Sequence, residues 1–131
     1  MKKRWYLIVG TLFIICTLIF YLNTEKKLSI QTNIKSYSSL SSAVNGIKMN
    51  ALANNLKDAE FYWTTSNGEF LKSKSKDSTG LSVTWCGPSI DTPINDAIMV
   101  NLTAKNKQGK ILASSSISIA RNGVEYYIIE N

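Results

Sequence analysis

The sequence predicts an all-β protein: a two-sheet antiparallel sandwich of about seven strands, preceded by one transmembrane helix. Two patterns lead to this prediction. Residues 5–22 carry no charge, whereas after residue 27 the hydrophobic period changes to two, as in half-buried strands. The boundary between the patterns divides the chain into residues 1–27, a cytoplasmic stub with a membrane anchor and a short link, and residues 28–131, one outer domain. A chain of 131 residues has room for one such domain.

Residues 5–22 are long enough to cross a bilayer as a helix. At a rise of about 1.5 Å per residue they extend over roughly 27 Å, close to the thickness of the hydrocarbon core. Lys2, Lys3 and Arg4 precede this run, while residues 23–27 carry only one net positive charge. The excess of positive charge before the run predicts a cytoplasmic N-terminus and an extracytoplasmic domain, held in the cell membrane by a single pass.

A cleaved signal peptide is the alternative interpretation of this segment, and it would leave a secreted domain. Signal peptides have a shorter apolar run that ends in small residues. Here residues 19–22 are bulky and no small-residue cleavage motif follows, which favours an uncleaved anchor. The bulky Ile15 before Cys16 argues against a lipidated cysteine.

The outer domain contains seven short runs in which apolar and polar residues alternate. They lie at residues 28–34, 47–53, 59–63, 81–85, 98–104, 111–119 and 124–128. Gly68, Gly109 and the Asn122-Gly123 dipeptide mark turns between runs, and the dipeptide is typical of type I′ hairpins. Alternation places Leu81 and Ile111 inward. It also assigns six residues to the centre of a two-sheet core: Phe61, Trp63, Val83, Trp85, Val100 and Leu102.

Three segments of the outer domain resemble bacterial immunoglobulin-like and polycystic-kidney-disease (PKD-type) domains. They are FYWTTSNGEF at 61–70, VTW at 83–85 followed by Pro88, and IMVNLTAKNKQGK at 98–110. The resemblance implies a sandwich with the aromatic-x-Trp pair in the core and a hairpin at residues 106–109 joining the last two main strands. It implies no activity. Residues 64–68 stand where the PKD pattern has an Asp-Phe-Gly-Asp-Gly turn.

The net charge of +6 does not indicate a nucleic-acid-binding protein. Residues 28–131 carry ten basic and eight acidic residues, so most of the excess lies in the N-terminal segment. This balance excludes the basic footprint that nucleic acids require. The chain has no histidine, and its two cysteines, Cys16 and Cys86, lie in different segments, which excludes a zinc cluster and a His-dependent triad.

No set of residues predicts catalysis, a cofactor, a metal or a small-molecule substrate. Cys86 has no histidine base, so a bystander thiol is favoured over a reactive thiol or one bridged to another chain. Asp91, Asn95 and Asp96 share one loop but are too few to hold Ca²⁺. The longest polar connections, at residues 36–42, 72–80 and 87–96, are too short to build a cleft.

Three tyrosines are the candidate binding residues, because tyrosine is enriched in protein interfaces. They are Tyr62, Tyr126 and Tyr127, which we expect to form an exposed row. The expected function is that of a membrane-anchored, extracytoplasmic, non-catalytic binding or accessory module of the cell envelope that contacts a protein partner. A structural spacer subunit is the alternative function, and an enzyme is the least favoured.

Overall fold

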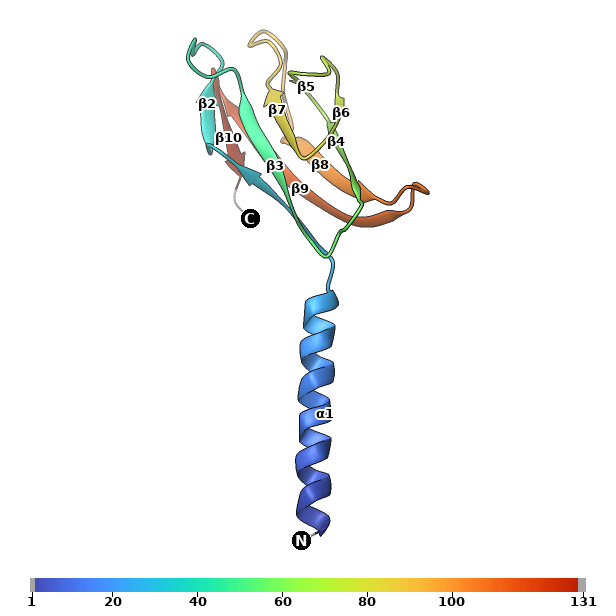
Figure 1. Cartoon of the computed structure of the whole chain (residues 1–131). Helices are drawn as coiled ribbons and strands as arrows, with labels where there is room; N and C mark the ends of the chain where they lie inside the picture. The colour runs from blue at the N-terminus through green and yellow to red at the C-terminus, as the bar shows by residue number, and fades with distance from the viewer. Residues whose placement is uncertain (1, 130–131) are drawn as a thin grey trace.

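The structure is a computed structural model that describes residues 2–129 and, within the helix, the side chains of residues 8–20. One helix, α1 (Lys2–Thr24), leads into a domain built of strands (Figure 1). The strands are β1 (Lys27–Thr32), β2 (Ser36–Ser38), β3 (Ile47–Asn54), β4 (Glu60–Thr65), β5 (Glu69–Phe70), β6 (Asp77–Thr79), β7 (Ser82–Cys86), β8 (Ile98–Lys105), β9 (Ile111–Asn122) and β10 (Glu125–Ile129).

The strands form two antiparallel sheets, which confirms the predicted all-β, two-sheet architecture. The four-stranded sheet has the order β1-β3-β7-β5, and the six-stranded sheet has the order β2-β10-β9-β8-β4-β6. The first order corresponds to strands A, B, E and D of an immunoglobulin sandwich, and β4, β8 and β9 correspond to C, F and G. The fold is therefore compatible with an immunoglobulin-like domain. Strands β2 and β10 extend the larger sheet beyond β9, and β6 extends it beyond β4.

The inner faces of the two sheets meet in one hydrophobic core. Trp63 on β4 and Trp85 on β7 are its largest fully buried side chains. Val83, Val100 and Leu102 are also buried, and Phe61 is half-buried against the same cluster. Both indole N–H groups are satisfied: Trp63 donates to the carbonyl of Gly80 at 2.8 Å, and Trp85 donates to Thr65 Oγ1 at 3.0 Å. Buried tryptophans keep their stabilising effect because their polar atoms have partners.

The sequence prediction missed three strands and misplaced some apolar residues at strand ends. Strands β2, β5 and β6 have only two or three residues each, so no period could reveal them. Leu81 and Ile111 were predicted to point inward and are instead exposed. Leu81 precedes β7 in a turn, and Ile111 opens β9 opposite a break in the register between Ala104 and Lys105. Both residues lie at the N-terminal ends of strands.

The last hairpin also differs from the prediction. Glu125 pairs with Asn122, so the two connecting residues are Gly123 and Val124, not Asn122 and Gly123. Gly123 has a φ of +60°, whereas Val124 is not among the residues with positive φ. A positive φ at the first central residue alone fits a type II′ turn, in which glycine occupies that position. The type I′ prediction was therefore wrong.

Helix α1 projects from one end of the domain, and the described part of this helix has no extensive contact with any strand (Figure 1). In the part of the chain that the structure describes, no helix is long and apolar enough to cross a membrane. The predicted span, residues 5–22, includes residues 5–7 and 21–22, which lie outside the described side chains. The membrane span therefore stays a prediction from the sequence.

Candidate interaction surface

The outer face of the six-stranded sheet is a regular surface of the domain. Cross-strand register places Thr64 on β4, Asn101 on β8 and Ser116 on β9 side by side on this face. Alternate residues of a strand share a face, so the residues two positions away on each strand form neighbouring rows on this face. These rows also carry short polar side chains. These rows add Thr79, Thr103, Ser114 and Ser118. The centre of the face is thus rich in hydroxyl groups.

Three apolar side chains interrupt this polar face near the C-terminal strand. Met99 and Ile129 are each 37% exposed, and Tyr127 is 42% exposed. Ile129 and Met99 both pair with Ser118, so they flank β9 from its two sides, and Tyr127 lies two residues before Ile129 on the same face. The Ser118 hydroxyl lies 3.1 Å from the sulfur of Met99. We call Met99, Tyr127 and Ile129 the apolar patch.

The apolar patch contains only one of the three predicted binding residues. The sequence prediction omitted Met99 and Ile129. Alternation along the strands could have identified both, because Met99 lies between the buried Ile98 and Val100, and Ile129 shares the parity of Tyr127. The patch combines an aromatic and a methionine side chain with short polar neighbours. Interfaces are enriched in tyrosine and methionine and depleted of charge at their centres.

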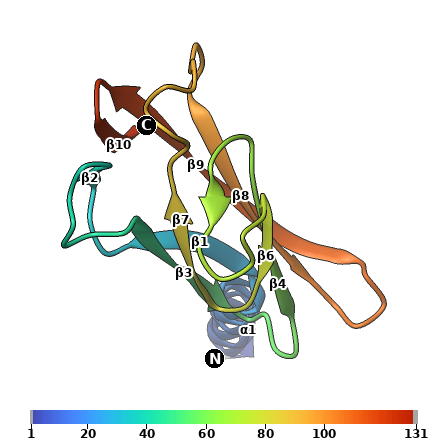
Figure 2. The same ribbon diagram turned by 90° about the horizontal axis from the view of Figure 1, so that it is seen from above.

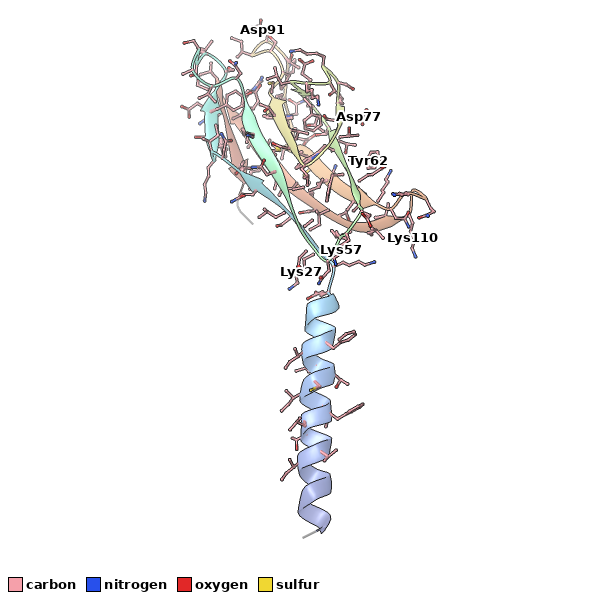
Figure 3. The ribbon with its side chains drawn as sticks, viewed as in Figure 1. Lys27, Lys57, Tyr62, Asp77, Asp91 and Lys110 are labelled. Atoms are coloured by element: carbon pink, nitrogen blue, oxygen red, sulfur yellow. The ribbon has the colours of Figure 1, made fainter. Side chains whose placement is uncertain are left out.

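Tyr62 lies elsewhere on the same face, and its side chain is already engaged. Its hydroxyl donates to Glu60 Oε2 at 2.7 Å, and Lys105 Nζ lies 4.6 Å from its ring centroid. The hydrogen bond to the Glu60 carboxylate raises the pKa of Tyr62. Tyr62 lines an open hollow of about 540 Å³ together with Lys72 and Asp77. Figure 3 shows Tyr62 and Asp77 on the same side of the domain. With its hydroxyl and one ring face occupied, Tyr62 is a weaker binding candidate than Tyr127.

Tyr126 does not belong to an exposed row, because the structure buries it completely. Its exposed fraction is 0%, and its hydroxyl donates to the carbonyl of Pro88 at 2.8 Å. Its ring stacks on Tyr37 with 5.4 Å between centroids and meets Trp85 edge-on at the same separation. Tyr126 and Tyr127 are consecutive residues of a strand and so point to opposite faces. The prediction of three exposed tyrosines was wrong for Tyr126.

The buried aromatic cluster fixes the start of the loop between β7 and β8. The Tyr37 hydroxyl accepts a hydrogen bond from the backbone N–H of Gly87 at 2.6 Å. Burial raises the pKa of Tyr37 to about 12, so the neutral hydroxyl is maintained at physiological pH. Further along the loop, Arg121 donates to the carbonyl of Thr92 at 2.8 Å. These three side chains, Tyr37, Tyr126 and Arg121, hold the loop against the larger sheet.

The same loop carries the three oxygen-bearing side chains that we considered for Ca²⁺. Asp91 lies at the end of the domain opposite α1 (Figure 3), and Asp91, Asn95 and Asp96 are all exposed. Across the described residues, no group of three histidine, cysteine or acidic side chains is placed to hold a metal ion. The loop therefore offers solvated carboxylates at a well-held position.

Cys86 is half-buried at the end of β7, and its thiol is engaged with the backbone. The Cys86 sulfur donates to the carbonyl of Asn45 at 2.8 Å. Burial raises the pKa of the Cys86 thiol, which keeps it protonated. Since the thiolate is the reactive form, this environment disfavours nucleophilic chemistry at Cys86.

No protein-family model, curated protein sequence or solved structure matches this chain. The resemblance to PKD-type and bacterial immunoglobulin-like domains thus stays a prediction from the sequence. The arrangement of the strands is compatible with an immunoglobulin-like domain.

Proposed function

We propose that this chain is a membrane-anchored, extracytoplasmic, non-catalytic binding module of the cell envelope, with an immunoglobulin-like domain that contacts a protein partner. The observation that carries the proposal is the apolar patch, in which a tyrosine, a methionine and an isoleucine side chain share one sheet face. The patch lies at the centre of ordered β structure, where β8 and β10 both pair with β9. A preformed surface of this kind binds without a large cost in ordering.

The anchor is supported by the surface of α1. Large apolar side chains are exposed all round this helix, where a water-soluble helix would show a polar face. They are Ile8, Val9, Leu12, Phe13, Ile14, Ile15, Leu18, Ile19 and Phe20. These described side chains are all more than half exposed and have no extensive contact with any strand. Lipid would cover this surface, and the basic residues at positions 2–4 favour a cytoplasmic N-terminus.

A short connection between α1 and the domain favours a partner at the membrane. Two residues, Glu25 and Lys26, separate the end of α1 from the start of β1. The Asn55 side chain donates to the carbonyl of Glu25 at 3.1 Å, which ties this connection to the turn between β3 and β4. A domain held so closely meets the outer part of another membrane protein more readily than a distant soluble one.

The decisive experiment is crosslinking of the full chain in its native membrane, followed by identification of the captured proteins. A patch variant carries Tyr127→Ala and Ile129→Ala. Its matched control carries Leu40→Ala and Ile90→Ala, two exposed apolar residues in loops away from the patch. Because all four side chains are exposed, the free energy of unfolding of both variants should lie within about 1 kcal/mol of that of the unchanged protein.

We expect one stoichiometric membrane protein to be captured by the unchanged chain and by the control, and to be lost with the patch variant. Recovery of the chain alone, or only with copies of itself, would favour the structural spacer instead. Capture that the patch variant leaves unchanged would remove the apolar patch as the binding surface.

A further inference from the structure

The excess positive charge of the domain gathers at the end where α1 enters. Antiparallel register brings three segments to that end: the start of β1, the turn between β3 and β4, and the hairpin between β8 and β9. They carry six lysines, which we call the basic rim: Lys26, Lys27, Lys57, Lys105, Lys107 and Lys110. Figure 3 shows Lys27 and Lys57 beside the end of α1 and Lys110 in the hairpin.

The acidic residues of these segments do not cancel the rim. Only Glu25, Asp58 and Glu60 accompany the six lysines, which leaves a net charge of +3. The other charged residues after position 27 are six basic and six acidic ones, whose charges sum to zero. Lys27 pairs with Glu25 at 3.1 Å, and Glu60 is engaged by the Tyr62 hydroxyl. The sandwich is thus polarised along the direction of α1.

Exposed aliphatic side chains accompany the lysines at the same end. Leu52 is 50%, Leu81 61% and Ile111 60% exposed. Leu52 and Leu81 line an open hollow together with Lys27, and the Leu81 carbonyl accepts a hydrogen bond from Ala51 N–H at 2.8 Å. Figure 2 shows the β8–β9 hairpin, which carries Ile111 at its base, projecting to one side of the domain. Lysine heads interspersed with aliphatic side chains are typical of surfaces that lie at a lipid interface.

We propose that the basic rim binds the anionic phospholipid headgroups of the membrane that holds α1. This inference rests on the proposed anchoring, because the two-residue link places the rim next to the end of the helix. The three residue steps from Thr24 to Lys27 reach at most about 11 Å, which is only a few ångströms more than the roughly 5–8 Å of one headgroup layer. Lysines so close to an anionic surface lie within the Debye length of about 8 Å at physiological salt and are weakly screened.

The position of the basic rim, as well as its charge, indicates that it binds the membrane surface. A protein partner could use any face of the domain, but the bilayer is the one surface that the link holds against this end. Headgroup contact would also fix the direction in which the apolar patch faces along the membrane. The rim thereby gives the partner-binding face a defined orientation.

The test is hydrogen–deuterium exchange of the full chain in lipid nanodiscs. One set of discs contains phosphatidylcholine alone, and the other adds phosphatidylglycerol. The rim variant carries Lys57→Gln, Lys107→Gln and Lys110→Gln, all exposed positions in the turns. The matched control carries Lys48→Gln, Lys72→Gln and Lys74→Gln, which change the net charge equally but lie outside the rim.

We expect the amides of residues 55–58 and 106–110 to exchange more slowly in the anionic discs. The slowing of exchange should decrease about fivefold for each substituted lysine that contacts the headgroups. It should disappear in the rim variant and at high salt, and persist in the control. A chain that stays with the discs but exchanges equally in both lipids would overturn this inference alone. A chain that elutes apart from the discs would overturn the anchoring as well.

Discussion

Replacing Trp63 with alanine is expected to lower the free energy of unfolding by about 3–5 kcal/mol. Trp63 is fully buried on β4, which pairs with β8 on one side and β6 on the other. The substitution opens a cavity between the sheets and leaves the carbonyl of Gly80 without its indole partner. A loss of this size is a large part of the 5–15 kcal/mol that stabilises a typical domain.

Chemical denaturation followed by far-ultraviolet circular dichroism measures this loss. Trp63→Phe is the matched variant, because it keeps an aromatic ring and should therefore lose less stability. Tyr127→Ala serves as a surface control, whose free energy of unfolding should change by no more than about 1 kcal/mol. If Trp63→Ala unfolded at nearly the same denaturant concentration as Tyr127→Ala, Trp63 would not be a core residue.

Replacing Gly87 with alanine is the second large effect, with an expected loss of about 1–3 kcal/mol. Only a hydrogen allows the ring of Tyr126 to approach the backbone here, since a Cβ at position 87 would collide with that ring. Tyr126 has no space to retreat, because it stacks on Tyr37 and its hydroxyl is bonded to Pro88. The aromatic cluster must shift, which also strains the hydrogen bond that the backbone N–H of Gly87 donates to the Tyr37 hydroxyl.

Gly109→Ala separates this collision from backbone strain. Gly109 has a φ of +80°, but a Cβ there meets no atom within 4 Å. Its substitution should cost about 1–2 kcal/mol through the left-handed backbone alone and leave the aromatic cluster unchanged. Near-ultraviolet circular dichroism, which reports on packed tyrosines and tryptophans, should therefore change for Gly87→Ala and not for Gly109→Ala. Equal spectra for the two variants would contradict the packing role of Gly87.

The sequence predicted the longer strands well because their alternation reports directly on two-sided burial. The run of Ile98, Val100 and Leu102 is one example, and all three are buried. Alternation failed at the ends of strands, where Leu81 and Ile111 are exposed. It gave no signal for β2, β5 and β6, whose pairing depends on neighbours far along the chain.

The candidate surface was harder to predict than the fold. Tyr127 was identified, but Tyr126 was added to it although consecutive strand residues face opposite sides. Met99 and Ile129 become neighbours only when β9 lies between β8 and β10, which requires the pairing itself. The basic rim could not be predicted either, because it too depends on the pairing of the strands. The sequence shows a small net charge, whereas the register collects three separated turns at one end.

The central proposal is that α1 holds the sandwich at the outer surface of a membrane, and protease treatment of intact cells tests it most directly. The proposal predicts that added protease removes the domain and leaves a membrane-bound fragment that still begins at residue 1. A C-terminus that stays protected until the membrane is opened would contradict the orientation. A mature N-terminus after residue 22 would instead identify a cleaved signal peptide and a secreted domain.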